Sequence, residues 1–278
     1  MPGARGRQCH FKLTSRRKDG GRVVRKAITS IAGRAEPADQ AVMKGIRIIA
    51  ITVSVLASIG SVAFADEDTD ALLVLAADVS YSVNAAKFNL QRVGYAKAIT
   101  NRRVVHSMTS GVSGRIAACF FEWSGESWQD LVVDWTLIDS VDAAERFAYR
   151  ILHAPRPFPE RTSISAAINF ALLQLSRSPF RSSRRIIDIS GDGDNNAGPD
   201  VSLARDEAVL QGVTINGLVI LSEDVREHTS PSGGLDQYYR RNVIGGVGSF
   251  VIVSHGLKSF EDSLSKKIII EIARHGSP

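Results

Sequence analysis

The feature that most constrains the fold is an alternation of short apolar runs with longer segments of helical periodicity. Apolar runs occupy 72–77, 116–121, 186–189, 213–221 and 250–253, and helical patterns occupy 84–100, 141–152, 163–176, 199–212 and 260–272. A nearly continuous apolar run is typical of a parallel strand that is buried on both faces. Segment 131–138 alternates instead, which favours an antiparallel edge strand joined by a hairpin to the second run. The pattern predicts an α/β fold with a mostly parallel central sheet and helices on both faces.

The N-terminal part differs from the rest of the chain. Residues 43–65 combine a basic start, an uncharged run and small residues up to Ala65, which is the pattern of a secretory signal peptide cleaved after that residue. The alternative is an uncleaved membrane anchor, since about 18 uncharged residues could barely span a bilayer. We expect 1–42 to be a non-native or disordered extension upstream of a start at Met43. The mature chain is then expected to be a single periplasmic or secreted domain over 66–278, without a membrane span.

Charge and cysteine content exclude several classes of function. The chain has a net charge of +5 at pH 7, but the positive excess lies in its N-terminal segments. Residues 66–278 contain 22 basic and 26 acidic side chains, and a mildly acidic domain gives no reason to expect nucleic-acid binding. The two cysteines, Cys9 and Cys119, form no zinc-type spacing. The sequence also has no phosphate-loop, dinucleotide-binding or nucleophile-elbow motif.

Three short polar segments stand where the predicted strands end or a helix begins. An Asp-x-Ser-x-Ser motif follows the first apolar run, a threonine precedes the 163–176 helix, and Asp-Gly follows the third run. The oxygen-bearing residues of these segments are Asp78, Ser80, Ser82, Thr162 and Asp192. Because the carboxyl ends of parallel strands meet at one edge of the sheet, we expect these side chains to gather there. Two carboxylates and three hydroxyls suit a hard divalent cation, Mg²⁺ first, with Mn²⁺ or Ca²⁺ as alternatives.

This set of segments resembles the metal-ion-dependent adhesion site of von Willebrand factor type A (vWA) domains. The resemblance extends over 70–275 and is greatest to secreted, single-domain bacterial vWA-like proteins of unknown function. It implies a Rossmann-type three-layer α/β/α sandwich in which the five residues form the metal shell, some of them through water. Two positions depart from the family pattern: Glu160 and Arg161 precede the threonine where Gly is usual, and Gly191 precedes the last aspartate where Thr or Ser is common. Both departures leave the ligand types intact and concern loop geometry.

The resemblance further implies an exported, non-catalytic module that holds the cation and docks an Asp or Glu side chain of a protein partner. Hydroxyl ligands are neutral, so positive charge remains on the ion for such a charge-assisted contact. Tyr81, Asp194 and Asn195 are expected to contact the partner at the rim of the site. Two alternatives stay open. One is a metal-dependent hydrolase in which Asp194 or Asp188 activates water, and the other is a structural protein with a vestigial metal site.

Simpler roles are open for several of these residues. Ser82 or Asn84 could cap the helix predicted at 84–100, and Thr162 could cap the helix predicted at 163–176. Ser, Thr and Asn are all common N-caps. Asp188 lies inside a predicted buried strand. There it is either hydrogen-bonded internally or facing a polar cleft, and the sequence does not distinguish the two.

Overall fold

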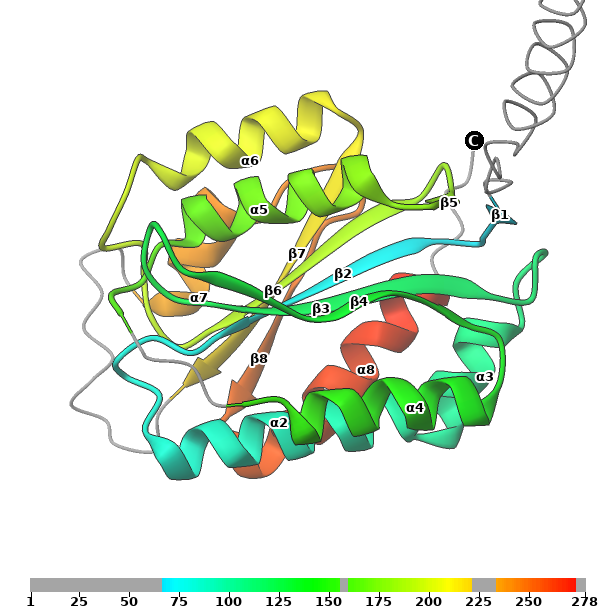
Figure 1. Ribbon diagram of the computed structural model, residues 1–278. Helices are drawn as coiled ribbons and strands as arrows, with labels where there is room; N and C mark the ends of the chain where they lie inside the picture. The colour runs from blue at the N-terminus through cyan, green and yellow to red at the C-terminus, as the bar shows by residue number, and fades with distance from the viewer. Residues whose placement is uncertain (1–66, 156–159, 222–233, 274–278) are drawn as a thin grey trace, which may run out of the picture. The chain divides into compact units, whose positions relative to one another are not determined.

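The central sheet is the frame of the domain. The computed structural model describes residues 67–155, 160–221 and 234–273 (Figure 1). Within these ranges, one sheet contains β2 (Leu72–Asp78), β3 (Ile116–Trp123), β4 (Gln129–Ile138), β6 (Arg185–Gly191), β7 (Val213–Leu221) and β8 (Val251–His255). Their order across the sheet is β4-β3-β2-β6-β7-β8, and every neighbouring pair is parallel except β3 and β4. The predicted mostly parallel sheet with one antiparallel edge strand is confirmed.

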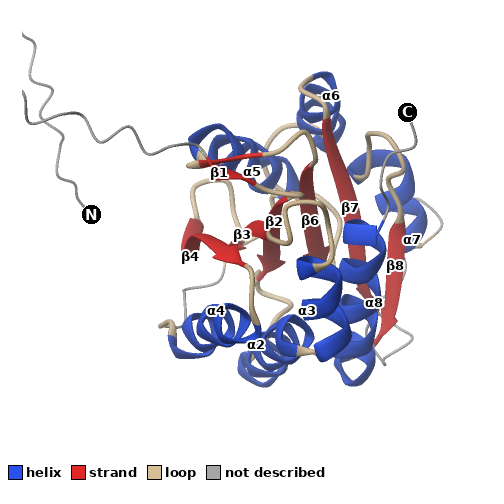
Figure 2. Ribbon diagram, turned by 90° about the vertical axis from the view of Figure 1, so that its right-hand side faces the viewer, coloured by secondary structure: helices blue, strands red, loops and turns tan. Residues whose placement is uncertain are grey.

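Helices cover both faces of this sheet, which gives the predicted three layers. One face carries α2 (Ala85–Thr100), α3 (Arg102–Thr109), α4 (Val141–His153) and α8 (Phe260–Ala273). The other face carries α5 (Ile164–Arg177), α6 (Val201–Leu210), the short α7 (Leu235–Tyr238) and the π-helical turn η2 (Tyr239–Val243). Figure 2 shows the two helical layers from the side, with α5 and α6 above the strands and α2 and α4 below them.

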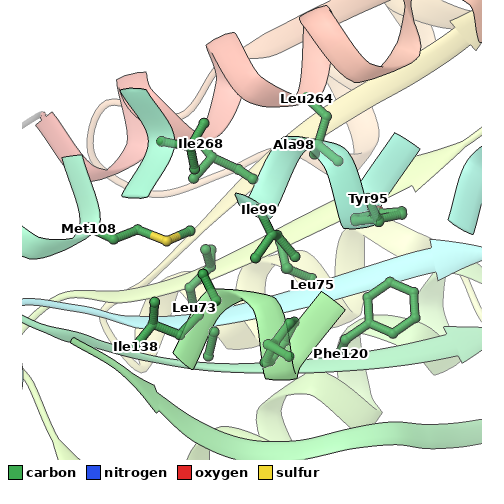
Figure 3. Close-up of a cluster of buried hydrophobic side chains, with 14 of the residues drawn as sticks. Leu73, Leu75, Tyr95, Ala98, Ile99, Met108, Phe120, Ile138, Leu264 and Ile268 are labelled. Carbon is green, nitrogen blue, oxygen red and sulfur yellow. The ribbon is translucent and has the colours of Figure 1, made fainter. Parts of the chain in front are cut away.

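Each face of the sheet has its own hydrophobic core. Leu73 and Leu75 of β2 belong to the core under α2, α4 and α8, together with Ile99 of α2 and Ile268 of α8 (Figure 3). Leu72 and Val74 of the same strand belong to the core under α5 and α6. A strand between two cores needs apolar side chains at successive positions, which explains its continuous apolar run. Burying each of these side chains contributes roughly 1.5–3 kcal/mol.

The chain leaves β2 and β6 toward opposite sides of the sheet. From β2 it passes through α2 and α3 to β3, and from β6 it passes through α6 to β7 on the other side. In open α/β sheets, ligands bind at the carboxyl edge where the strand order reverses in this way. Asp78 ends β2 and Gly191 ends β6, two neighbouring strands. The predicted site therefore falls at this reversal point.

Three short elements are not indicated by the sequence pattern. β1 (Glu67–Asp68) and β5 (Phe180–Arg181) pair in parallel as a separate two-stranded ladder, and α3 begins directly after Asn101. Between β7 and β8, the described part of the connection contains α7 followed by η2.

The expected signal peptide and the extension before it lie outside the described residues. In the ranges that the structure describes, no helix is both long and apolar enough to cross a membrane.

Candidate metal centre

Four of the five predicted ligands meet at the carboxyl edge of the sheet. Ser82 Oγ donates a hydrogen bond of 2.5 Å to Asp192 Oδ1, which joins the loop after β2 to the loop after β6. Ser80 Oγ lies 3.2 Å from Ser82 Oγ. The backbone N–H of Ser80 donates to Asp78 Oδ1 at 2.7 Å. The turn after β2 thus brings one carboxylate and two hydroxyls to the carboxylate of the neighbouring strand.

Thr162 borders the same loop. Its N–H donates to Asn196 Oδ1 at 3.0 Å, and its carbonyl accepts hydrogen bonds from the N–H groups of Asn196 and Ala197. A Cβ placed on Gly193, the residue after Asp192, would stand 3.6 Å from Thr162 Oγ1. The fold therefore places Thr162 beside the loop that follows Asp192.

Helix capping does not occupy these hydroxyls. Asn84 caps α2 by accepting hydrogen bonds from the N–H groups of Ala86 and Lys87. Ser163 caps α5, so neither Ser82 nor Thr162 serves as the cap. Because neighbouring residues do the capping, the side-chain oxygens at the sheet edge are available for another role.

The Asp78 carboxylate is in an unfavourable environment for a charge. It is 1 % exposed, and its Oδ2 atom has no hydrogen-bond partner in the described part of the chain. Burial, and secondly the charge of Asp192, raise its pKa to about 7, although the N–H groups of Ser80 and Asp192 act in the opposite direction. A buried carboxylate with one unpaired oxygen costs free energy, which a bound cation would offset.

The chemistry of the donors fits a hard divalent cation. The five residues offer only oxygen atoms, which Mg²⁺, Mn²⁺ and Ca²⁺ prefer. Among the described residues no three His, Cys, Asp or Glu side chains gather into a metal cluster, so hydroxyls would have to complete the shell. The residues present could hold such an ion.

The three residues expected to contact a partner differ in their exposure and in their hydrogen bonds. Tyr81 is 70 % exposed at the edge of the site, and Asp194 is half-buried. The amide of Asn195 hydrogen-bonds within the chain: its Oδ1 accepts from the N–H of Ser165 at 3.1 Å, and its Nδ2 donates to the carbonyl of Pro199 at 3.0 Å. Contact of these residues with a partner stays a prediction.

Asp188 is ion-paired inside the protein and does not stand at the rim of the site. Its Oδ1 lies 2.7 Å from Nζ of Lys267, whose ammonium also donates to Glu271 Oε1 at 2.5 Å. Asn216 Nδ2 donates to the same glutamate oxygen at 2.8 Å. Asp188 of β6 and Lys267 of α8 are both fully buried where this helix packs on the sheet. Asp188 is therefore not placed to activate water for a hydrolase.

Two further side chains belong to the neighbourhood of the site. Lys87 Nζ donates to the carbonyl of Ser82 at 3.1 Å and lies 3.7 Å from Asp192 Oδ2. Tyr239, from η2, is fully buried, and its ionisation is opposed by burial first and then by the charges of Asp78 and Asp192, which raise its pKa. Sequence reasoning missed both, because no motif marks a single Lys or Tyr.

A hollow of about 270 Å³ lies beside the carboxylates, between α2, the end of β7 and the chain after β8. Asp78, Lys87 and Asp192 stand at one side of it. The rest of its wall is mainly apolar and consists of Val83, Leu90, Ile220, Leu221 and Leu257.

Comparisons with known proteins agree with this fold. The family model described as "Protein of unknown function (DUF1194)" matches residues 68–276, and no curated protein matches the chain. Proximal thread matrix protein 1 from the mussel byssus aligns with 14 % identity over 74 % of this chain and 46 % of its own, with a TM-score of 0.50. The pilus adhesin SpaC from Lactobacillus rhamnosus GG aligns with 12 % identity over 74 % of this chain and 31 % of its own, with a TM-score of 0.54.

A von Willebrand factor type A protein from Catenulispora acidiphila aligns with 15 % identity over 73 % of this chain and 43 % of its own, with a TM-score of 0.47. The chain spans less than half the length of each of these solved structures. At such identities the likeness concerns the fold and not the activity. The chain belongs to the DUF1194 family, and its described domain has the vWA-like three-layer α/β/α fold.

Proposed function

We propose that this chain is an exported, non-catalytic protein-binding module with a divalent-cation site. Asp78, Ser80, Ser82, Thr162 and Asp192 would hold the ion, Mg²⁺ most readily. The observation that carries the proposal is the Asp78 carboxylate, which is buried beside Asp192 with one oxygen unpartnered among the described residues. A cation bound between a buried carboxylate and a second, partly exposed one would offset their repulsion and the cost of burying the charge.

The protein's own residues would prepare the site for an acidic ligand. The Ser82–Asp192 hydrogen bond fixes the two loops, and the N–H of Ser80 orients Asp78. When bound, the ion supplies a positive centre to which an Asp or Glu of a partner can coordinate. Lys87, 3.7 Å from Asp192, adds a second positive charge at the same edge. The exposed ring of Tyr81 gives the partner an aromatic contact there.

The neighbouring hollow indicates which kind of side chain the partner carries next to its acidic residue. Its volume of about 270 Å³ is below the range of about 300–1,000 Å³ that is usual for small-molecule sites. Its apolar wall, which includes Leu90, Ile220 and Leu257, suits one aliphatic side chain. We infer that the partner presents an acidic residue next to a leucine-like residue.

Partner capture from the cell envelope tests the binding function. With Mg²⁺ the protein is expected to retain a partner that EDTA releases, and a short Asp-Leu peptide is expected to compete better than Asp-Gly. Asp78→Ala should abolish capture without unfolding the domain. Asp206→Ala, which changes an exposed aspartate of α6, is the matched control and should capture normally. Undiminished capture by the metal-free protein contradicts the proposal.

Export through the 43–65 segment is part of the same proposal. The basic start and the small residues before position 66 support cleavage after Ala65. N-terminal sequencing of the mature protein is expected to begin at Asp66. A mature chain that begins well upstream of this residue would show that 43–65 is not removed.

A further inference from the structure

A buried hydroxyl near the candidate metal centre lacks a partner. Tyr239 in η2 is 0 % exposed, and its hydroxyl has no hydrogen-bond partner among the residues that the structure describes. Leaving such a group unpaired costs about 1–3 kcal/mol, so a buried hydroxyl in a native fold normally has a role. π-helical turns like η2 are often found at functional sites.

Two glycines in neighbouring strands make room for this tyrosine. A Cβ on Gly217, inside β7, would stand 2.9 Å from Cδ1 of the Tyr239 ring. A Cβ on Gly191, at the end of β6, would overlap the Tyr239 hydroxyl. Gly inside a strand weakens it and commonly marks a close approach of another group. Here both glycines admit the same side chain, one its ring and the other its hydroxyl.

The Tyr239 hydroxyl lies near the carboxylate of Asp78, one of the proposed metal ligands. The Cβ position on Gly191 that would overlap the Tyr239 hydroxyl also lies 3.1 Å from Asp78 Oδ2. This oxygen is the one that has no hydrogen-bond partner among the described residues. A buried donor without an acceptor and a buried acceptor without a donor therefore border the same small space.

We propose that Tyr239 is a positioning residue of the metal centre. Its O–H donates toward Asp78 Oδ2, directly or through one bound water, and holds that carboxylate in the orientation that a cation requires. This inference rests on the proposed function, since it assumes that the site binds a divalent ion. Groups that orient metal ligands typically change metal affinity 10–100-fold when they are removed.

The space beside Gly191 can hold one hydroxyl at a time. With the tyrosine hydroxyl removed, the nearest atoms to a Cβ at 191 are Asp78 Oδ2 at 3.1 Å and Asp78 Cβ at 3.5 Å. A serine side chain would then fit with a small adjustment. Its hydroxyl would reach the carboxylate from the strand instead of from η2, so the two sources of the hydroxyl can be exchanged.

The experiment measures Mn²⁺ binding to the EDTA-treated full chain by titration calorimetry, together with the melting temperature in EDTA. Tyr239→Phe is expected to bind Mn²⁺ at least tenfold more weakly than the wild type, while its melting temperature does not fall. Gly191→Ser should bind weakly because its side chain collides with Tyr239. The double variant, Tyr239→Phe with Gly191→Ser, should recover most of the affinity. Tyr149→Phe, which removes the hydroxyl of an exposed tyrosine of α4, should bind like the wild type.

The outcomes separate this inference from the function on which it rests. Wild-type affinity in Tyr239→Phe overturns the positioning role and leaves the metal site intact. A double variant that binds no better than Tyr239→Phe overturns the exchange of hydroxyls and with it the proposed geometry. A wild-type chain that binds no Mn²⁺ overturns the proposed function, and the inference falls with it.

Discussion

The Asp78 side chain shows how a fold can carry a group that destabilises it. Its carboxylate is buried beside Asp192, and its pKa of about 7 lies above the ordinary value of 3.8. Between these two pH values the folded state binds more protons than the unfolded state, so the free energy of unfolding falls as pH rises through this window. Without a cation the site is therefore least favourable above pH 7.

Asp78→Asn separates stability from binding. An amide keeps the size of the side chain and removes the buried charge, so above pH 7 in EDTA the variant should be more stable than the wild type. The expected gain is on the order of 1–3 kcal/mol. Adding Mg²⁺ should raise the melting temperature of the wild type and leave that of the variant unchanged. A variant that melts below the wild type in EDTA would show that the charge of Asp78 is compensated within the metal-free protein.

The sequence predicts some residues of the candidate site and gives no local sign of others. The serines after β2 and the aspartate after β6 stand in motifs at strand ends, where the topology of a parallel sheet fixes their meeting point. Tyr239 reaches the site from the long connection between β7 and β8, and a lone tyrosine there carries no local signal. The departure at Gly191 was the available sign, since a missing side chain at a crowded position indicates that another group fills the space.

At the scale of elements, α8 is held to the sheet by buried charges as well as by apolar contacts. Lys267 lies between Asp188 of β6 and Glu271 of its own helix, and Asn216 of β7 donates to the same glutamate. One ammonium thus faces two carboxylates. Breaking a buried ion pair by removing one partner costs far more than the pair contributes, because the remaining charge stays buried.

Lys267→Met tests this anchoring of α8. The substitution leaves Asp188 and Glu271 buried without their cation, so the free energy of unfolding should fall by about 3–5 kcal/mol in urea titrations. Lys266→Met changes the adjacent, exposed lysine and should stay within about 0.5 kcal/mol of the wild type. Equal stabilities of the two variants would contradict the anchoring role.

The same cluster should give the domain a pH-dependent stability. Burial raises the pKa of Glu271 from 4.5 to about 7, and Asp188 acts in the same direction, whereas Lys267 and Asn216 oppose it. The folded state then binds more protons than the unfolded state between these values, so stability is lost as pH rises from about 4.5 to about 7. Glu271→Gln should flatten this part of the profile and be the more stable protein at pH 8. Parallel profiles of variant and wild type would contradict the assignment.

The helices and strands that the sequence predicts are those long enough to show a hydrophobic period. β2 and β7 are apolar over most of their length, and the hairpin strand β4 alternates. β1 and β5 contain two residues each, too few for any period, and depend on each other for pairing. α3 is separated from α2 only by Asn101, which serves as the C-cap of one helix and the N-cap of the next.

For the whole molecule, the position of the site follows from the strand order. β2 and β6 are adjacent at the point where the connections diverge, and their carboxyl ends carry Asp78 and the Gly191-Asp192 pair. The alternation of strands and helices was sufficient to predict that these carboxyl ends share one edge of the sheet, whereas the adjacency of β2 and β6 is a finding of the structure. The buried cluster under α8 and the tyrosine beneath the site depend on side-chain packing across distant segments, which periodicity does not report.

Binding of an ion to the native state alone must stabilise the whole domain. At a free Mg²⁺ concentration one hundred times the dissociation constant, the gain is about 2.7 kcal/mol. For a domain of this size that corresponds to a rise of roughly 5–10 °C in melting temperature. Differential scanning calorimetry in EDTA and in Mg²⁺ checks this. An unchanged melting temperature would favour a structural protein with a vestigial site.

Anomalous diffraction from crystals soaked in Mn²⁺ tests the central claim most directly. The account predicts one strong peak at the carboxyl edge of β2 and β6, about 2.0–2.3 Å from its direct oxygen ligands. Those ligands should come from Asp78, Ser80, Ser82, Thr162 and Asp192, some of them through water. A fully soaked crystal with no peak there, or with its only peak elsewhere on the chain, would contradict the account.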